Sequence, residues 1–382
     1  MTDSIQSSAH GAFTIPSLDG LRAIAVMIVF IGHCASVPGL WPGHVGVTIF
    51  FFLSGYLITT LLRREYSKTD NISLKNFYLR RLLRITPPAL FSIALCVAVG
   101  AAGILPANMN GWGILAEVLN YTNYYLAYVN GHDGLPPESS MLWSLAVEEH
   151  FYLIFPAALI LLLGRKLTYR QIGYFLLFAA AIAPFWRLYL HLQGANFYRL
   201  YTSTDTRYDG LLVGAAMALL WNPALGDKAP LNLTSDLIVK WITPSALIVF
   251  AAFSIFPDPH RLTVVDSILY ICLIPVFWTI IAHPRGWIGK ILNTQWIMRI
   301  GVLSFSLYLI HRLFLGLCSE YIHVKPLADA SALVLSLVAA QGMYTFIEKP
   351  AGRIRKRLEQ RAMSRQSLIK SISTKSNLEE SR

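Results

Sequence analysis

The sequence predicts an all-α polytopic membrane protein with about ten transmembrane helices. Of its 382 residues, 55% are hydrophobic and only 14% are charged, whereas a soluble domain carries about 25% charged residues. Apolar runs close to the ~20 residues needed to cross hydrocarbon recur along the whole chain. Such a chain lacks the polar side chains that cover a soluble surface, so its expected environment is the lipid bilayer.

Ten apolar segments are expected to cross this bilayer, at residues 21–38, 44–62, 85–105, 143–163, 171–190, 208–222, 241–256, 264–282, 300–318 and 327–347. The stretch 112–128, "WGILAEVLNYTNYYLAY", is aromatic and polar enough to lie at the membrane surface, where Tyr and Trp concentrate. An eleventh crossing there would place the later basic loops on the outer side, so ten crossings are preferred.

The basic residues predict the orientation. Residues 63–84 carry seven Lys/Arg and the chain after Glu348 carries ten, and such loops stay in the cytoplasm. Both termini are therefore expected to be cytoplasmic, with a tail at 1–14, a membrane domain at 15–355 and a basic, disordered tail at 356–382. This topology explains the net charge of +11 without a nucleic-acid partner. The four cysteines lie in apolar runs without metal-ligand spacing, and no metal site is expected.

Charged residues inside apolar segments are the functional candidates, because each costs about 2.5–3.5 kcal/mol on insertion scales. Arg22 and His33 are eleven residues apart. On an ideal helix this offset is about 1100°, only ~20° from whole turns, with a rise of about 16 Å. The two side chains therefore share one face, and one ligand could touch both. A membrane-surface anchor for Arg22 and a buried hydrogen bond for His33 remain open alternatives.

Glu148 and Glu149 lie in the fourth segment. Consecutive residues on a helix point about 100° apart, so at most one of them faces a given cavity directly. An ion pair between one glutamate and Arg207 is the structural alternative.

Four further groups lie at segment ends or near mid-membrane. Arg207 and Asp209 stand at the outer mouth of the sixth segment, His311 near the middle of the ninth, and Glu348 at the inner end of the last. A helix end tolerates charge, so packing or capping roles are open for the first two and for Glu348.

Seven stretches resemble, in order, the signature segments of the family-3 integral membrane acyltransferases: "LDGLRAIAVMIVFIGH", "FFFLSGYLIT", "RRLLRITPP", "WSLAVEEHFYLIFP", "TRYDGLLVGAAMA", "SFSLYLIHRLF" and "FIEKPAGR". The family's arginine–ten residues–histidine motif matches Arg22 and His33. Its glutamate pair matches Glu148 and Glu149, although His150 follows where a glutamine is commoner.

The resemblance implies O-acylation, most often acetylation, of a sugar on an envelope polysaccharide or its lipid-linked precursor, in the cell inner membrane. It also implies acyl-coenzyme A, in the first place acetyl-coenzyme A, as donor substrate, with no tightly bound cofactor. Some members carry an extracytoplasmic hydrolase-like domain, so a separate extracytoplasmic transferase is a candidate partner. The alternatives are a lipid or secreted small molecule as acceptor, or a secondary transporter, although the paired halves of transporters are not evident.

The expected mechanism follows from these residue types. His33, whose ordinary pKa is about 6.5, is the predicted base, and Glu148 or Glu149 is expected to orient its imidazole. Arg22 suits the phosphates of coenzyme A, and its ~16 Å rise to His33 is comparable with the coenzyme's extended arm. Direct transfer and an acyl-enzyme on His33 or Ser54 both remain open. The resemblance implies acceptor or supporting roles for Arg207, Asp209, His311 and Glu348.

Overall fold

The computed structural model describes residues 15–37, 42–230, 233–256 and 261–358. The predicted tail at 1–14 and most of the one at 356–382 lie outside these residues. Within the described ranges the chain is helical and contains no β-strand, apart from one isolated bridge between Met109 and Gly134. The predicted all-α class is confirmed.

The longer helices are α1 (Leu18–Gly32), α2 (His44–Thr69), α3 (Leu74–Ala101), α6 (Leu142–Gly164), α7 (Tyr169–Leu192), α10 (Asp209–Leu220), α12 (Thr243–Ser254), α13 (Asp266–Ala282), α15 (Gln295–Tyr321) and α16 (Lys325–Met343). Short helices connect them: α4 (Gly111–Val118), α5 (Thr122–Val129), α8 (Phe197–Thr202), α9 (Thr204–Arg207), α11 (Ser235–Leu237) and α14 (Trp287–Leu292). A 3₁₀ turn, η1 (Pro223–Leu225), and three π-helical segments, η3 (Ile238–Ile242), η4 (Arg261–Val265) and η5 (Tyr344–Glu348), complete the order.

Each of the ten predicted segments contains a helix, but eight helices of the described chain are long and apolar enough to cross a membrane. The two shorter ones are α1, with 15 residues, and α10, with 12. They can be short because longer helices surround them: α10 packs against α2, α7 and α13, and α1 against α15 and α2. The stretch 112–128 forms two short helices, α4 and α5, and contains no long one.

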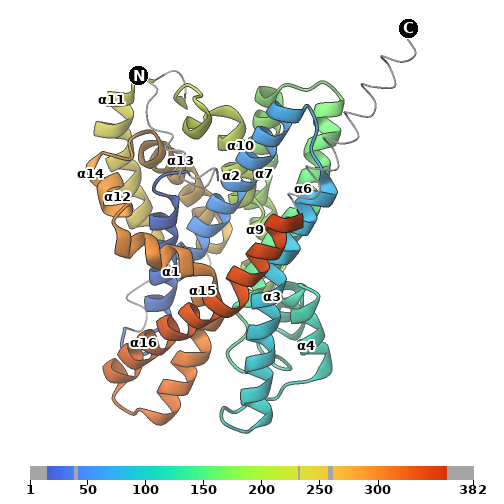
Figure 1. The fold of residues 1–382 in the computed structure, drawn as a ribbon, viewed down its shortest axis with the longest axis vertical. Helices are drawn as coiled ribbons and strands as arrows, with labels where there is room; N and C mark the ends of the chain where they lie inside the picture. Colours follow the sequence, from blue (N-terminus) through green and yellow to red (C-terminus); the bar gives the residue numbers. More distant parts are fainter. Residues whose placement is uncertain (1–14, 38–41, 231–232, 257–260, 359–382) are drawn as a thin grey trace.

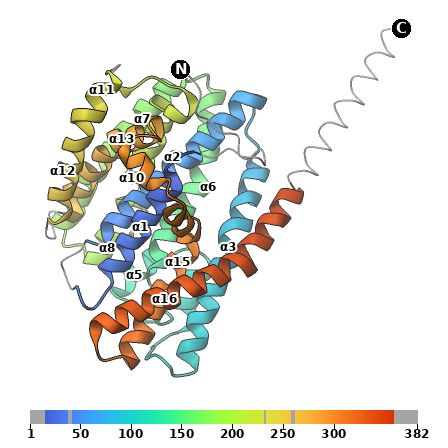
Figure 2. The same cartoon turned by 60° about the vertical axis from the view of Figure 1, so that its left-hand side comes forward.

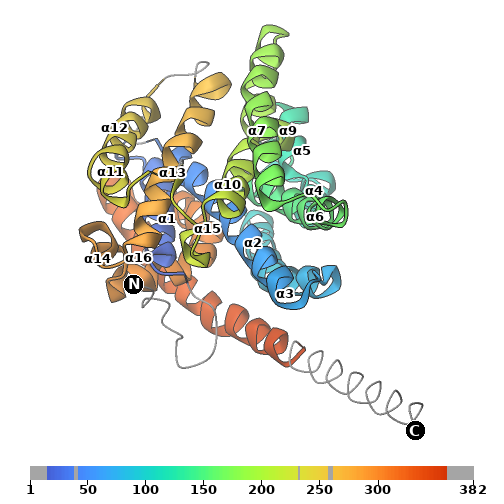
Figure 3. The ribbon, with the colours of Figure 1, turned by 90° about the horizontal axis from the view of Figure 1, so that it is seen from above.

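Helices α2 and α10, most of whose residues are buried, lie in the centre of the bundle (Figure 1). Seen from above, α10 and α2 lie between α13 and α12 on one side and α7 and α6 on the other (Figure 3). Figure 2 shows the long helix that starts at α16 crossing α15 and then following α3, which η5 contacts. This helix continues through η5 to Leu358.

Glycines allow the closest approach in this centre, between α2 and α10. A Cβ on Gly55 would lie 2.0 Å from the Leu211 carbonyl oxygen, and one on Gly214 would lie 2.1 Å from the carbonyl oxygen of Phe52. The two backbones therefore touch where they cross, as small residues permit in membrane helices.

Nine lysines and arginines gather at one end of the bundle, which we call the basic end. It comprises the end of α2 and the start of α3, with Arg64, Lys68, Arg80, Arg81 and Arg84, and the helical residues after η5, with Lys349, Arg353, Arg355 and Lys356. The first described residue, Ile15, lines a cavity with Arg355 at this same end. The placement of this end in the cytoplasm stays a prediction from its charge.

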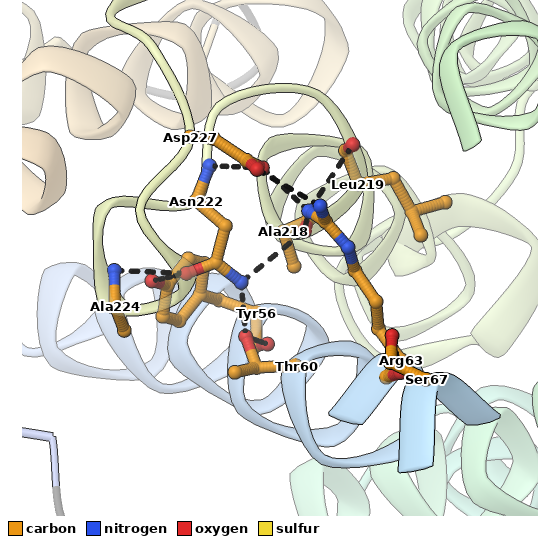
Figure 4. Close-up of polar contacts among 9 residues, drawn as sticks. All are labelled: Tyr56, Thr60, Arg63, Ser67, Ala218, Leu219, Asn222, Ala224 and Asp227. Carbon is orange, nitrogen blue, oxygen red and sulfur yellow. Dashed lines mark hydrogen bonds and ion pairs between the residues drawn. The ribbon is translucent and has the colours of Figure 1, made fainter. Parts of the chain in front are cut away.

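A polar clamp holds the end of α10 against α2 (Figure 4). Arg63 donates two hydrogen bonds to the carboxylate of Asp227, at 2.5 and 2.8 Å, and two to the carbonyl oxygens of Ala218 and Leu219, at 3.0 and 3.4 Å. The last carbonyls of a helix have no partner within it and carry its negative dipole end. The Arg63 guanidinium therefore satisfies these carbonyl oxygens and, through Asp227, also anchors the turn that follows α10.

Asn222 extends this clamp deeper into the bundle (Figure 4). Its side-chain oxygen accepts a hydrogen bond from the Tyr56 hydroxyl at 2.5 Å, and its amide donates to the Thr60 hydroxyl at 2.8 Å. Asn222 is fully buried, so these bonds compensate for removing the amide from water.

Replacing Arg63 by Met should lower the free energy of unfolding by about 2 kcal/mol, because hydrogen bonds to a charged group contribute about 1.5–3 kcal/mol. Denaturant unfolding in detergent micelles measures this change. The matched control is Ser67→Ala on the same helix, which removes one exposed local hydrogen bond and should have an effect within about 0.5 kcal/mol. Equal stability of the two variants would contradict the role of the clamp.

Glu117 of α4 yields a second prediction. It is 3% exposed, its Oε1 accepts a hydrogen bond from the Ser139 hydroxyl, and its Oε2 has no hydrogen-bond partner in the described chain. Burial raises the pKa of this carboxyl from 4.5 to about 8, so the folded protein holds a proton that the unfolded chain releases at neutral pH. Because of Glu117, the free energy of unfolding therefore falls as the pH rises from about 4.5 to about 8.

Glu117→Gln, which is neutral and of the same shape, should match the wild type in melting temperature at about pH 4, where the carboxyl is protonated in both states, and exceed it at about pH 9. Thermal unfolding at both pH values measures the difference. The same gain at both pH values would show that the carboxyl does not titrate as stated.

Candidate functional site

Arg22 of α1 stands where three cavities meet at or near the basic end. One, of about 530 Å³, lies between α1, α2 and α3; a second, of about 710 Å³, lies against η5 and the helix after it. Arg22, Arg84 and Arg355 line both. The Arg22 side chain is 19% exposed, and its guanidinium donates a hydrogen bond to the Asp19 carboxylate at 3.3 Å. Its remaining donors therefore face a region rich in cations, which suits a polyanion.

The third cavity, of about 120 Å³, runs into the bundle from Arg22, and we call it the inner cavity. Glu148 of α6 and Glu348 of η5 line it together with Arg22. Glu148 accepts a hydrogen bond from the Tyr152 hydroxyl at 2.8 Å, and Glu348 accepts one from the Ser306 hydroxyl at 2.5 Å. Three residues singled out in three distant segments of the sequence thus face one space.

A larger cavity of about 640 Å³ opens at the other end of the bundle, and we call it the outer cavity. Tyr308 of α15 lines both this cavity and the inner one. Its hydroxyl lies 2.5 Å from the Ser144 hydroxyl and donates to the carbonyl oxygen of Met141 at 3.1 Å. Tyr308 therefore stands at the boundary between the two cavities and is held there from α6.

Aromatic rings form one wall of the outer cavity. The Trp143 ring packs 4.8 Å from that of Tyr201, which in turn stacks 5.2 Å from Phe197. Next to them, the Tyr198 hydroxyl lies 3.0 Å from Nε2 of His132. This wall offers flat apolar faces beside groups that form hydrogen bonds.

His33 lies between the outer cavity and a further one of about 300 Å³, and lines both. It follows the last residue of α1 directly, and its Nδ1 lies 2.9 Å from the Val29 carbonyl oxygen. The same Nδ1 lies 3.2 Å from Nε2 of His311. His311 is 1% exposed, and its Nδ1 lies 2.7 Å from the Tyr308 carbonyl oxygen. The structure thus joins two histidines that the sequence suggested separately.

The structure does not show the expected contact between a glutamate and the His33 imidazole. The Glu148 carboxylate lies in the inner cavity with Arg22, and Oε1 of Glu149 is buried without a hydrogen-bond partner in the described chain. The reason is geometric: Tyr308 separates the inner cavity from the outer one, and the recorded partners of the His33 ring come from α1 and α15.

Arg207 and Asp209 have other surroundings than expected. Arg207 is fully buried and pairs with Asp266, and Asp209 pairs with Arg187 at 3.0 Å. They keep the expected place at the start of the sixth segment, because α9 ends at Arg207 and α10 begins at Asp209, but both are buried in ion pairs. The alternative ion pair of Arg207 with a glutamate is wrong. Arg207 still borders the site indirectly, because its guanidinium packs 5.5 Å from the Tyr201 ring of the outer-cavity wall.

Sequence reasoning missed four charged residues that the site depends on. Arg187 and Asp266 supply the counter-charges just described. Arg312 lines the same two cavities as His33 and pairs with Glu138 at 2.6 Å. Asp329 of α16 accepts hydrogen bonds from the backbone N–H groups of Ala35, at 3.2 Å, and Ser36, at 2.9 Å, and so anchors the turn after His33. All four lie inside predicted apolar segments, so the reasoning that selected Arg22 and His33 also applies to them.

The chain is similar in sequence to known acyltransferases. The family described as "Acyltransferase domain" matches residues 15–345. A provisionally named O-acetyltransferase of Staphylococcus aureus strain COL is 34% identical over 351 residues, which are 88% of this chain and 57% of that protein. The peptidoglycan O-acetyltransferase OatA of Listeria monocytogenes is 30% identical over 354 residues, 88% and 55% of the two chains.

The O-acetyltransferase OatA of S. aureus strain NCTC 8325 is 31% identical over 356 residues, 88% of this chain and 57% of that protein. The chain thus spans a little over half the length of these relatives. No solved structure matches it. The resemblance noted in the sequence is confirmed, and this multi-pass membrane protein belongs to the acyltransferase-domain family.

Proposed function

We propose that this protein moves an acyl group, in the first place acetyl, from acyl-coenzyme A to a sugar hydroxyl of an envelope polysaccharide or its lipid-linked precursor. The observation that carries the proposal is the row of cavities from Arg22 at the basic end, past Tyr308, to His33 in the outer cavity. A donor can enter at one end and an acceptor at the other. The name of the Listeria relative, a peptidoglycan O-acetyltransferase, supports a cell-wall glycan as acceptor.

The donor half of the site is cationic at its entrance, and its inner cavity is lined by both apolar and charged side chains. Arg22, Arg84 and Arg355 offer fork-shaped donors that suit the phosphates of coenzyme A. Leu57 and Phe305 line the inner cavity, which is narrow enough for a chain-like group and too small for a nucleotide. The pantetheine arm would therefore extend along the inner cavity while the nucleotide stays at the basic end, which we place in the cytoplasm.

The acceptor half combines the aromatic wall with two groups suited to the chemistry. His33 takes the proton of the attacking hydroxyl. Arg312, which lines the same cavities, provides positive charge for the oxyanion of the tetrahedral intermediate. Trp143 and Tyr201 supply flat faces for a sugar ring. Placing this end outside the inner membrane lets the acceptor approach without crossing it.

Loss of the His33 imidazole should abolish acylation in cells. In a strain lacking the protein, wild type should restore the O-acetyl content of the envelope polysaccharide measured by NMR. His33→Ala should leave it about 100-fold lower or more, since general base catalysis contributes 10²–10⁴-fold. The control is His323→Ala in an exposed loop, with equal amounts of each variant in the membrane. Full restoration by His33→Ala would refute the base assignment, and unchanged acetylation without the protein would refute the polysaccharide acceptor.

Arg22→Lys should weaken acetyl-coenzyme A binding by about tenfold, because a lysine keeps the charge but loses the fork that binds phosphate at two points. Isothermal titration of the purified protein in nanodiscs measures the Kd. Arg299→Lys is the matched control, because Arg299 bonds Gln341 and packs on Tyr344 instead of lining these cavities. Equal affinity of wild type and Arg22→Lys would rule out the phosphate role.

A further inference from the structure

The contacts of His33 and His311 determine which nitrogen of each ring carries a proton. A carbonyl oxygen only accepts hydrogen bonds, so a ring nitrogen beside one must carry a proton. Nδ1 of His311 lies 2.7 Å from the Tyr308 carbonyl oxygen. Nδ1 of His33 lies 2.9 Å from the Val29 carbonyl oxygen. Both rings therefore carry their proton on Nδ1.

The remaining nitrogens follow from the neutral form of each ring. A neutral imidazole with a proton on Nδ1 has a lone pair on Nε2. Nε2 of His311 can then accept a second, shared hydrogen bond from Nδ1–H of His33, at 3.2 Å. A proton on Nε2 of His311 would instead point at the N–H of His33, and two donors would face each other. Only one set of tautomers satisfies all three contacts.

We propose that His311 is a positioning residue that holds His33 in the tautomer with Nδ1 protonated, so that Nε2 of His33 is the atom that accepts the substrate proton. The inference rests on the proposed function, because it names the atom that performs its proton transfer. His33 is exposed to the cavities, whereas His311 is 1% exposed. The buried ring thus acts together with the Val29 carbonyl oxygen to hold the proton of the exposed ring on Nδ1, as a buried carboxylate does in hydrolytic triads.

The reaction balances with these two rings. Nε2 of His33 removes the proton of the acceptor hydroxyl while its oxygen forms a bond to the thioester carbonyl carbon. The carbon–sulfur bond then breaks, and the coenzyme A thiolate takes the proton from Nε2 to leave as the thiol. The imidazolium that exists between these steps already donates Nδ1–H to two acceptors, His311 and Val29. No ring has to turn during the reaction, which reduces its reorganisation.

The surroundings keep both rings in place. The Phe30 and Tyr308 rings pack against His311, with centroids 6.3 and 5.6 Å away. On the other side, Asp329 anchors the turn that follows His33. His311 therefore has little freedom to present another atom to His33.

The first test reads the tautomer directly and needs no activity. The wild-type protein in nanodiscs, labelled with ¹⁵N-histidine, should show His33 protonated on Nδ1 and bare on Nε2 by solid-state NMR, with its signals identified by their loss in His33→Gln. In His311→Leu the share of His33 protonated on Nε2 should rise. A wild-type His33 protonated on Nε2, or an unchanged His33 tautomer in His311→Leu, would overturn the inference.

The second test is kinetic and uses a conservative replacement. His311→Gln keeps an oxygen acceptor near the place of Nε2, whereas His311→Leu has none. Incorporation of acetyl from acetyl-coenzyme A into the polysaccharide of membrane vesicles should show kcat lowered by about 10- to 100-fold in His311→Leu, as for other residues that orient a reactive group. His311→Gln should recover most of the rate, with the KM for acetyl-coenzyme A unchanged in both.

His323→Leu in the exposed loop is the control for expression and handling. Equal kcat loss in His311→Gln and His311→Leu, with both folded, would show that His311 only fills space and would overturn the inference. No acetyl transfer by the wild type would refute the proposed function instead, while the NMR result would still decide the tautomer.

Discussion

A charge within an apolar helix bundle needs a partner, and this constraint organises the centre of the protein. Two buried ion pairs, Arg187–Asp209 and Arg207–Asp266, join α7, α9, α10 and the start of α13. Removing one member of such a pair leaves an uncompensated charge, so the four groups specify which helices meet. The short helix α10 lies among them, and its glycines let α2 approach closely.

Around this centre, the candidate functional groups line two separate cavities. Arg22, Glu148 and Glu348 share the inner cavity, and His33 lines the outer one. Tyr308 stands between the two cavities, so in the function we propose the donor arm would reach the histidine past this ring. In that proposal the cationic end stays apart from the reacting atoms, which would favour transfer to a hydroxyl over loss of the thioester to water.

Much of the fold was predictable because the hydropathy and the basic charge of a segment depend only on the residues within it. All ten predicted segments contain helices, and the basic end gathers the segments from 63–84 and after Glu348. Helical periodicity predicted a shared face for Arg22 and His33, and the structure places the two side chains at different cavities. Glu348 and Glu148 could be named as candidates, but their meeting with Arg22 depends on how α1, α6 and η5 are placed around the inner cavity, which no single segment specifies.

The sequence by itself determined that this is a membrane protein built of helices, which family it resembles, and that Arg22 and His33 lie along one helix. Only the tertiary structure decided the partners: His33 meets His311 rather than a glutamate, and Arg207 meets Asp266. The physical reason is that composition and periodicity act within one helix. The contact between two charged or polar side chains depends on the rotation, depth and spacing of separate helices, and these are settled only when the whole bundle packs.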